Sequence, residues 1–168
     1  MNVILCGMMG AGKTVVGQRL AQRLGRRWID TDACIVEKYG EIAAIFKRFG
    51  EEYFRGLETE IVAELVQKDG LVISVGGGLA LREENVSLLK KNGKIVYLQA
   101  SAEILTERLG TGNSRPLLQT GELLTTVEEL LKKRASIYAR AADFTVDTDG
   151  KTIENVAFEI EAFLERNK

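Results

Sequence analysis

Histidine is absent from the sequence, and this absence narrows the possible chemistry. Without histidine there can be no Ser-His-Asp triad and no zinc site built on imidazole ligands. A general base must therefore be a carboxylate, a lysine, a tyrosine or a thiol with a perturbed pKa. The two cysteines, Cys6 and Cys34, are too far apart in sequence for a CxxC pair. We expect them to be small buried side chains of a reduced, cytoplasmic protein rather than a disulfide or a redox site.

An excess of charge is also absent, because 23 basic residues face 24 acidic ones and the net charge is −1. No basic face is therefore predicted for nucleic acid or for an anionic membrane. No apolar run approaches the roughly 20 residues of a membrane span, and no charged leader precedes the apolar N-terminal segment, so we expect no signal peptide. The length of 168 residues, 45% of them hydrophobic, fits one domain spanning 1–168. We expect a monomer whose partners are small molecules.

Short β-rich runs alternate with helical patterns along the chain. The expected strands are 2–7, 27–30, 71–76, 94–99 and 144–148. The expected helices are 13–24, 32–40, 42–67 with a break near Gly50, 82–91, 101–109, 125–141 and 152–166. This alternation predicts an α/β fold in three layers, with a five-stranded parallel sheet between two layers of helices. The only proline, Pro116, lies in "GTGNSRPLLQTG", and we expect a mobile lid at about 110–124.

The segment "GMMGAGKT" (7–14) matches the pattern G-x-x-x-x-G-K-[ST], directly after the first expected strand and at the start of the first expected helix. Glycines in such a loop let consecutive backbone N–H groups converge on phosphate oxygens, and the helix N-terminus adds positive potential. Lys13 is expected to bridge the β- and γ-phosphates, and the Thr14 hydroxyl to ligate Mg²⁺. The alternative is a glycine turn that only links a strand to a helix.

A phosphate-binding loop does not by itself name the acceptor. The chain has no N-K-x-D guanine motif, which argues against a switch GTPase, and the third strand ends in "ISVGGG" where a motor-type ATPase usually carries an acid. The acids come instead in "IDTDA", where Asp30 and Asp32 end the second strand and would share one of its faces. Because ligands bind at the carboxyl ends of parallel strands, we expect Asp30 to serve Mg²⁺ and Asp32 an acceptor hydroxyl. The alternative is a helix N-cap with a spare surface acid.

The chain resembles shikimate kinase along essentially its whole length. The matching pieces, in the order of the family, are "GMMGAGKT", "DTD", "IFKRFGEEYFRGLE", "GGG", "RPLL" and "RASIYARAADFTVDT". The resemblance implies a P-loop kinase fold like that of the nucleoside monophosphate kinases. It implies phosphorylation of the 3-hydroxyl of shikimate by ATP with Mg²⁺, a step toward chorismate and aromatic amino acids. The helices at about 32–67 would then bind the acceptor.

The resemblance also implies roles for individual residues. Asp32 would bind the shikimate hydroxyls and act as or assist the base, with Lys13 and Arg115 as the other catalytic residues. Arg55, which Glu58 can hold one helical turn away, would form a carboxylate clamp with Arg134. The remaining acceptor-binding residues would be Gly76, Gly77 and Gly78. Thr14 and Asp30 would serve the metal. Arg108 would stack on adenine, and Arg115 would swing over the γ-phosphate. The full set of ATP-binding residues would be Gly10, Ala11, Gly12, Lys13, Thr14, Val15, Arg108 and Arg115.

Several alternatives stay open on the sequence alone. Ile42, Phe46 and Phe54 look like the apolar wall of the acceptor pocket, but ordinary core packing explains them equally well. Arg55 and Glu58 could form a solvated ion pair. The segment "YGEIAAIF" is one residue shorter than the pattern of the family, and Ser136 replaces a proline. The competing functions are a small kinase for another hydroxy acid or a nucleoside monophosphate, and a nucleotide-binding regulatory protein without turnover.

Overall fold

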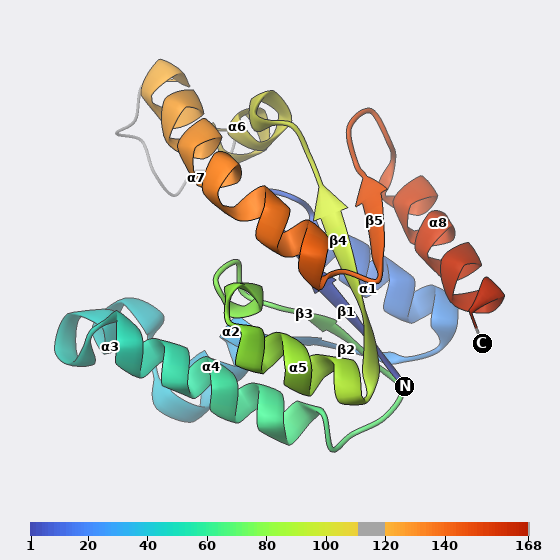
Figure 1. The fold of residues 1–168 in the computed structure, drawn as a ribbon, viewed down its shortest axis with the longest axis horizontal. Helices are drawn as coiled ribbons and strands as arrows, with labels where there is room; N and C mark the ends of the chain where they lie inside the picture. The colour runs from blue at the N-terminus through green and yellow to red at the C-terminus, as the bar shows by residue number, and fades with distance from the viewer. Residues whose placement is uncertain (111–119, 168) are drawn as a thin grey trace.

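A parallel sheet of five strands forms the centre of the protein, whose computed structural model describes residues 1–110 and 120–167 (Figure 1). The strands are β1 Asn2–Cys6, β2 Arg27–Asp30, β3 Leu71–Ser74, β4 Gly93–Gln99 and β5 Phe144–Asp147. Their order across the sheet is β2-β3-β1-β4-β5, and every neighbouring pair is parallel. The five-stranded parallel sheet predicted from the sequence is therefore present.

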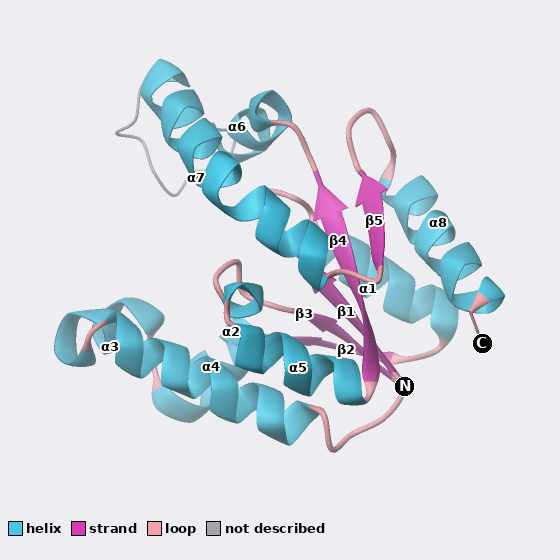
Figure 2. Cartoon of the chain, viewed as in Figure 1, coloured by secondary structure: helices cyan, strands magenta, loops and turns pink. Residues whose placement is uncertain are grey.

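Helices cover both faces of this sheet (Figure 2). They are α1 Lys13–Leu24, α2 Thr31–Tyr39, α3 Ile42–Phe49, α4 Glu51–Leu65, α5 Glu83–Lys91, α6 Ala102–Gly110, α7 Thr120–Ala141 and α8 Ile153–Arg166, with a short 3₁₀ helix η1 Leu79–Leu81. Figure 1 shows α1 and α8 on one side of the strands and α4, α5 and α7 on the other. Among the described residues, none of the helices combines the length and the apolarity needed to cross a membrane.

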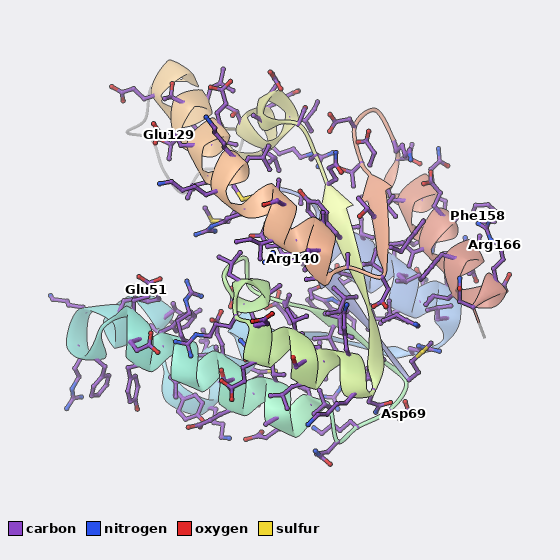
Figure 3. The ribbon with its side chains drawn as sticks, viewed as in Figure 1. Glu51, Asp69, Glu129, Arg140, Phe158 and Arg166 are labelled. Atoms are coloured by element: carbon purple, nitrogen blue, oxygen red, sulfur yellow. The ribbon has the colours of Figure 1, made fainter. Side chains whose placement is uncertain are left out.

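The inner strands are buried on both faces, as their continuous apolar runs predict. Every residue of β1 and of β3 is buried, whereas β2, at the edge of the sheet, carries the exposed side chain of Arg27. Aromatic pairs fix helices on the sheet: the ring centroids of Tyr97 in β4 and Tyr138 in α7 lie 5.3 Å apart. The charged residues labelled in Figure 3, such as Glu129 and Arg166, are exposed instead.

The element boundaries differ from the expected ones at a few places. The break near Gly50 is present: this residue has a φ of 85°, a left-handed conformation that suits glycine and separates α3 from α4. Helix α3 begins at Ile42, where the expected helix began, despite the shorter segment before it. Helix α7 begins at Thr120, five residues before the expected start at 125, so the last part of the predicted lid is helical. The lid residues 111–119 lie outside the described part of the chain, and the lid stays a prediction.

The side chain of Asn2 joins the amino ends of two strands. Its amide nitrogen donates to the carbonyl oxygen of Lys68 at 2.9 Å, and its oxygen accepts from the backbone N–H of Leu71 at 2.9 Å. Asn2 is only 1% exposed. Its loss would leave buried backbone groups without partners at the amino ends of the strands, whereas "GMMGAGKT" follows the carboxyl end of β1.

We therefore predict that Asn2→Ala lowers the free energy of unfolding by about 1–3 kcal/mol, the usual cost of unsatisfied buried polar groups. Urea unfolding measures this loss, and ATP kinetics should stay unchanged. The control is Thr126→Ala, which removes an exposed hydroxyl that bonds only within α7. We expect that control to stay within about 0.5 kcal/mol of the wild type. An equal loss in both variants would contradict the structural role of Asn2.

Candidate active site

The glycine-rich loop between β1 and α1 has the backbone that phosphate binding requires. Gly10 and Gly12 have φ values of 81° and 94°, which non-glycine residues rarely adopt, and Gly12 precedes the first residue of α1. The ammonium group of Lys13 donates to the carbonyl oxygens of Gly7 at 2.9 Å and Met8 at 2.8 Å. Lys13 therefore lies across the loop, next to the N-terminus of α1, where an anion would bind.

Two acids lie close enough to Lys13 to influence its charge. Burial lowers the pKa of Lys13 below its ordinary value, while the charges of Asp32 and Asp30 act in the opposite direction. The acids that follow β2 thus face the loop that follows β1. The structure brings together the lysine and the two aspartates that the sequence singled out.

The chain turns into a helix sooner than the strand pattern predicted. Strand β2 ends at Asp30, and the next residue, Thr31, already belongs to α2. Asp30 is the N-cap of α2, because its Oδ1 accepts from the backbone N–H of Asp32 at 2.8 Å and of Ala33 at 3.3 Å. The prediction that the two acids share one face of a strand was therefore wrong. The N-cap, considered as the alternative for this motif, is formed by Asp30.

Thr31 points inward instead of away from the site. It is fully buried, and its hydroxyl oxygen accepts from the backbone N–H of Gly76 at 3.0 Å. This bond ties the beginning of α2 to the loop after β3. It was not predicted, because an alternating strand would have placed Thr31 on the opposite face.

The triplet Gly76–Gly78, at the carboxyl end of β3, lies against the predicted acceptor-binding side chains. A Cβ at Gly76 would lie 2.7 Å from Oδ1 of Asp32, and one at Gly78 would lie 2.2 Å from Nη1 of Arg55. A Cβ at Gly77 would lie 3.9 Å from Nη1 of Arg134. The absence of side chains at these positions lets Asp32, Arg55 and Arg134 surround one short stretch of backbone.

Asp32 occupies an unusual electrostatic position for an aspartate. Burial raises the pKa of its carboxyl above the ordinary value, and the charge of Asp30 raises it further. Lys13 and Arg55 oppose this shift and favour the charged form. A carboxylate with a raised pKa beside a phosphate-binding lysine is suited to accept a proton from a substrate hydroxyl.

Arg55 is held in place by a buried carboxylate. Its Nη1 lies 2.8 Å from Oε2 of Glu58, which is only 1% exposed, and its Nη2 lies 3.3 Å from the exposed Glu51. Burial raises the pKa of Glu58, and the neighbouring Arg55 opposes that shift. The alternative of a solvated ion pair is wrong, because Glu58 has almost no contact with water. A buried carboxylate that loses its cation would be strongly destabilised, so this pair keeps the guanidinium oriented.

Tyr138 supports the same loop from α7, four residues after Arg134. Its hydroxyl donates to the carbonyl oxygen of Gly77, and the residue is fully buried. Burial raises the pKa of the Tyr138 hydroxyl, while the charge of Arg134 lowers it. The spacing of four residues places both side chains on one face of α7. The sequence contained this signal, but no role in holding Gly77 was predicted from it.

A small pocket of about 180 Å³ lies beside the glycine-rich loop, and its lining comes from the loop, α1, Arg108, the segment after β5 and the first turn of α8. Arg108 donates to the carbonyl oxygen of Gly10 at 3.2 Å and to the hydroxyl of Thr148 at 3.3 Å. Val15 also lines this pocket, as do Lys151, Ile153 and Val156. The last three were not among the predicted nucleotide-binding residues, because only their position after β5 brings them here.

The apolar residues predicted as a wall divide between the core and the surface. Phe54 is 4% exposed and belongs to the core, whereas Phe46 is 36% exposed. Their ring centroids lie 4.7 Å apart, so Phe46 packs on the core through Phe54, and the role of the pair as a pocket wall stays a prediction. Ile42 is partly buried against the core. Arg115, the predicted γ-phosphate contact, lies outside the described residues.

The site resembles that of one family in sequence and in fold. A sequence model of shikimate kinase matches residues 9–165. Shikimate kinase of Thermodesulfovibrio yellowstonii is 44% identical over 160 residues, which cover 95% of this chain and 92% of that protein. The solved structure of shikimate kinase from Acinetobacter baumannii in complex with shikimate matches with a TM-score of 0.89 at 38% identity, covering 99% of this chain and 94% of that one. The chain belongs to the shikimate kinase family.

Shikimate kinase from Aquifex aeolicus is similar as well, with a TM-score of 0.86 at 36% identity over 99% of this chain and 98% of that one. These findings confirm the resemblance stated from the sequence, and with it the P-loop kinase fold. The activity of the chain is that of the family, the ATP-dependent phosphorylation of shikimate on the route to aromatic compounds.

The oxygen donors beside the loop fit a magnesium ion. Mg²⁺ is usually held by one or two protein oxygens, and phosphates and water complete its octahedron. Thr14 presents an exposed hydroxyl in the first turn of α1, and the capping bonds of Asp30 use only its Oδ1. Within residues 1–110 and 120–167 there is no group of three acidic, thiol or imidazole side chains that could enclose a metal. The donors therefore suit an ion that arrives with a nucleotide.

Gly78→Ala tests the close approach of Arg55. The backbone of Gly78 has a φ of −90°, which alanine adopts readily, so the new methyl group affects chiefly the guanidinium 2.2 Å away. Because the resemblance assigns Arg55 to the acceptor, we predict that displacing it raises the KM for shikimate about 10- to 100-fold, the range for a lost charge-assisted hydrogen bond. The KM for ATP should remain unchanged in steady-state kinetics.

The matched control is Gly56→Ala, next to Arg55 on α4, where an added Cβ has nothing within 4 Å. This control should bind shikimate normally, and it should stabilise the helix by up to about 1 kcal/mol. An unchanged KM for shikimate in Gly78→Ala would show that the position of Arg55 does not matter for the acceptor.

Proposed function

We propose that Asp32, Arg55 and Arg134 bind shikimate over the Gly76–Gly78 loop and that Asp32 accepts the proton of its 3-hydroxyl. The observation that carries this proposal is the gathering of these three side chains around one glycine loop, beside Lys13. Shikimate combines a carboxylate with several hydroxyls on a compact ring. Two guanidinium groups suit the carboxylate, and a carboxylate base suits the hydroxyls.

The proposed acceptor site owes its shape to rigid supports. Glu58 fixes Arg55, and Tyr138 fixes the backbone of Gly77. A site held by such contacts loses little entropy when the ring binds, and it keeps the reacting hydroxyl near Asp32. The proposal assigns acceptor selectivity to this geometry rather than to a large induced rearrangement.

The proposed site for the phosphoryl donor, ATP, lies at the glycine-rich loop, so that Asp32 would stand between ATP and the acceptor site over Gly76–Gly78. The glycine-rich loop, from Gly10 to Val15, would hold the phosphates of ATP, and Arg108 would cover the adenine at the small pocket beside it. The 3-hydroxyl oxygen would bond to the γ-phosphorus while the bond from that phosphorus to the β,γ-bridging oxygen breaks and ADP leaves. Asp32 would take the proton of the hydroxyl, and Lys13 would stabilise the charge on the phosphoryl oxygens. Arg115, in the predicted lid at about 110–124, would add a second cation there.

Thr14 and Asp30 would hold Mg²⁺, Asp30 through water, while Asp30 continues to cap α2. The ion would offset phosphate charge when it is bound with ATP. We also propose a cytoplasmic location, where the free thiols of Cys6 and Cys34 stay reduced. The monomeric state expected from the sequence stays a prediction.

The proposed roles of the two aspartates separate under mutation. We predict that excess Mg²⁺ partly restores kcat in Asp30→Asn, because mass action offsets a weakened water-mediated contact and asparagine still caps a helix. Asp32→Asn should lose about 10²- to 10⁴-fold in kcat at every Mg²⁺ concentration, the usual contribution of a general base. The measurement is kcat against Mg²⁺ concentration, with ATP affinity measured alongside.

ATP affinity should survive in Asp32→Asn, because the glycine-rich loop is untouched. Rescue of Asp32→Asn by Mg²⁺, with no rescue of Asp30→Asn, would mean that the roles are reversed. ADP release with shikimate, quinate, gluconate or AMP as acceptor separates this proposal from a kinase for another hydroxy acid or for a nucleotide. Release that does not depend on any acceptor would oppose an acceptor role for Asp32.

The raised pKa of Asp32 predicts a pH effect with a definite sign. A base works only when deprotonated, so kcat/KM for shikimate should fall toward low pH, with a midpoint above the usual range of an aspartate. Asp30→Asn removes a negative charge that raises the pKa of Asp32, so the midpoint should move to lower pH at saturating Mg²⁺. Glu129→Gln removes the same charge from α7, far from this contact, and should leave the midpoint in place. A midpoint that does not respond to Asp30→Asn would exclude Asp32 as the titrating group.

A further inference from the structure

A chain of two hydrogen bonds links the edge strand of the sheet to the phosphate-binding loop. The indole N–H of Trp28 in β2 donates to the hydroxyl oxygen of Ser74 at 3.0 Å. The hydroxyl of Ser74, at the end of β3, donates to the main-chain oxygen of Lys13 at 2.7 Å. The directions follow from chemistry, because an indole nitrogen can only donate and a carbonyl oxygen can only accept. We propose that Trp28 and Ser74 are positioning residues that fix Lys13 for phosphate binding.

Gly17 makes this linkage sterically possible. It lies one helical turn after Lys13 in α1, and a Cβ at this position would lie 2.6 Å from both Oγ of Ser74 and Nε1 of Trp28. Glycine inside a helix costs about 1 kcal/mol relative to alanine. Because Gly17 has no side chain, the Ser74 hydroxyl can approach the carbonyl oxygen of Lys13 closely enough to form a hydrogen bond.

The contact with Ser74 holds the main chain at the first residue of α1. The N-cap of this helix, Gly12, has no side chain that could bond to the N–H groups of the first turn, so no side-chain cap fixes the start of the helix. The Ser74 hydroxyl does not bond to those N–H groups; it donates to the carbonyl oxygen of Lys13 from within the core, where Ser74 is only 2% exposed. The orientation of Lys13, and of Thr14 after it, therefore rests on Ser74.

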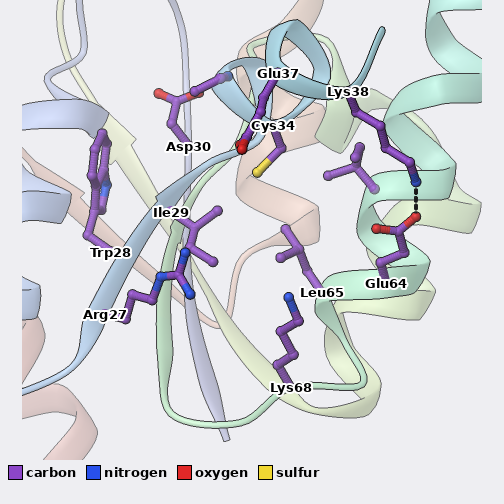
Figure 4. Close-up of a pocket in the computed structure, with 12 residues that line it drawn as sticks. Arg27, Trp28, Ile29, Asp30, Cys34, Glu37, Lys38, Glu64, Leu65 and Lys68 are labelled. Carbon is purple, nitrogen blue, oxygen red and sulfur yellow. Dashed lines mark hydrogen bonds and ion pairs between the residues drawn. The ribbon is translucent and has the colours of Figure 1, made fainter.

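Trp28 in turn fixes the rotamer of Ser74. A serine hydroxyl rotates freely, and the indole donor selects the orientation in which its proton points to Lys13. Figure 4 shows the indole of Trp28 on the opposite side of β2 from the side chains of Ile29 and Leu65. The indole nitrogen thus lies on the face of the sheet covered by α1, where a Cβ at Gly17 would lie 2.6 Å from it.

The test uses the full-length protein with ADP as the probe and three variants: Trp28→Phe, Ser74→Ala and the double variant. We expect Ser74→Ala to raise the Kd for ADP and the KM for ATP about 3- to 10-fold, the range for one lost hydrogen bond. Trp28→Phe keeps a ring and loses only the donor, so its effect should be smaller. The KM for shikimate should change less than twofold in all three variants.

The double variant separates a relay from two independent contacts. Because the indole acts through the hydroxyl, adding Trp28→Phe to Ser74→Ala should raise the Kd for ADP no further. Additive effects would overturn the relay. An ADP affinity within twofold of the wild type in Ser74→Ala would overturn the proposal as a whole. If Ser74→Ala does not fold, Trp28→Phe alone decides, and an unchanged Kd for ADP in that variant would overturn the proposal.

Asn2→Ala is the control for general destabilisation, because it loses buried hydrogen bonds at the amino ends of β1 and β3, away from the glycine-rich loop. Its Kd for ADP should equal that of the wild type, and an increase matching that of Ser74→Ala would contradict a positioning role. Trp28 is the only tryptophan, so its fluorescence reports on this linkage directly. ADP should change the emission of the wild type, and this change should be lost in Ser74→Ala. The same change in both proteins would contradict the linkage.

The inference rests on the proposed role of the glycine-rich loop in holding ATP, and Lys13→Ala tests that role separately. Normal ADP affinity in Lys13→Ala would reject the proposed function itself. Lost affinity in Lys13→Ala together with normal affinity in Ser74→Ala would reject only the positioning by Trp28 and Ser74.

Discussion

Charges removed from water must be paired, and this constraint shapes the whole site. Glu58 is buried next to the Gly76–Gly78 loop and is compensated by Arg55. Asp32, half-buried, is compensated by Lys13 and Arg55 together. The acids and cations therefore alternate from α4 to the glycine-rich loop, and none of these groups can be removed without leaving an uncompensated charge. Gly76 and Gly78 belong to the same arrangement, because a Cβ at either position would collide with Asp32 or with Arg55.

Most of the fold could be predicted, because its signals are local. The continuous apolar runs of β1 and β3 are typical of strands buried on both faces, and both strands are buried. Gly50 separates two helices because a left-handed residue ends a helix wherever it occurs. The start of α7 was missed, since Thr120 and Gly121 are typical of loops and the helix extends through them.

The sequence indicated which residues belong to the candidate site, but it did not predict most of the contacts between them. The spacing of "GMMGAGKT" indicated the loop, and the order of the motifs indicated the family. The period-two argument for Asp30 and Asp32 failed because β2 ends at Asp30 and both Thr31 and Asp32 already belong to α2. The contacts of Thr31 with Gly76, of Tyr138 with Gly77 and of Trp28 with Ser74 join segments at least 45 residues apart. No local pattern encodes such contacts, and they follow only from the order of strands in the sheet.

Strand β2 is short and lies at the edge, paired with β3 alone. It carries Trp28, which supports Ser74, and its last residue, Asp30, caps the helix that begins with Thr31 and Asp32. Edge strands of this kind are among the first parts of a sheet to open in local unfolding. An opening of β2 would release the support of the glycine-rich loop and the start of the helix that carries Asp32, the proposed base, at the same time. A ligand that binds at the glycine-rich loop and keeps β2 paired with β3 would thus also order Asp32, and the reverse would hold for a ligand bound at Asp32. Both binding events would then depend on the same free energy of opening β2.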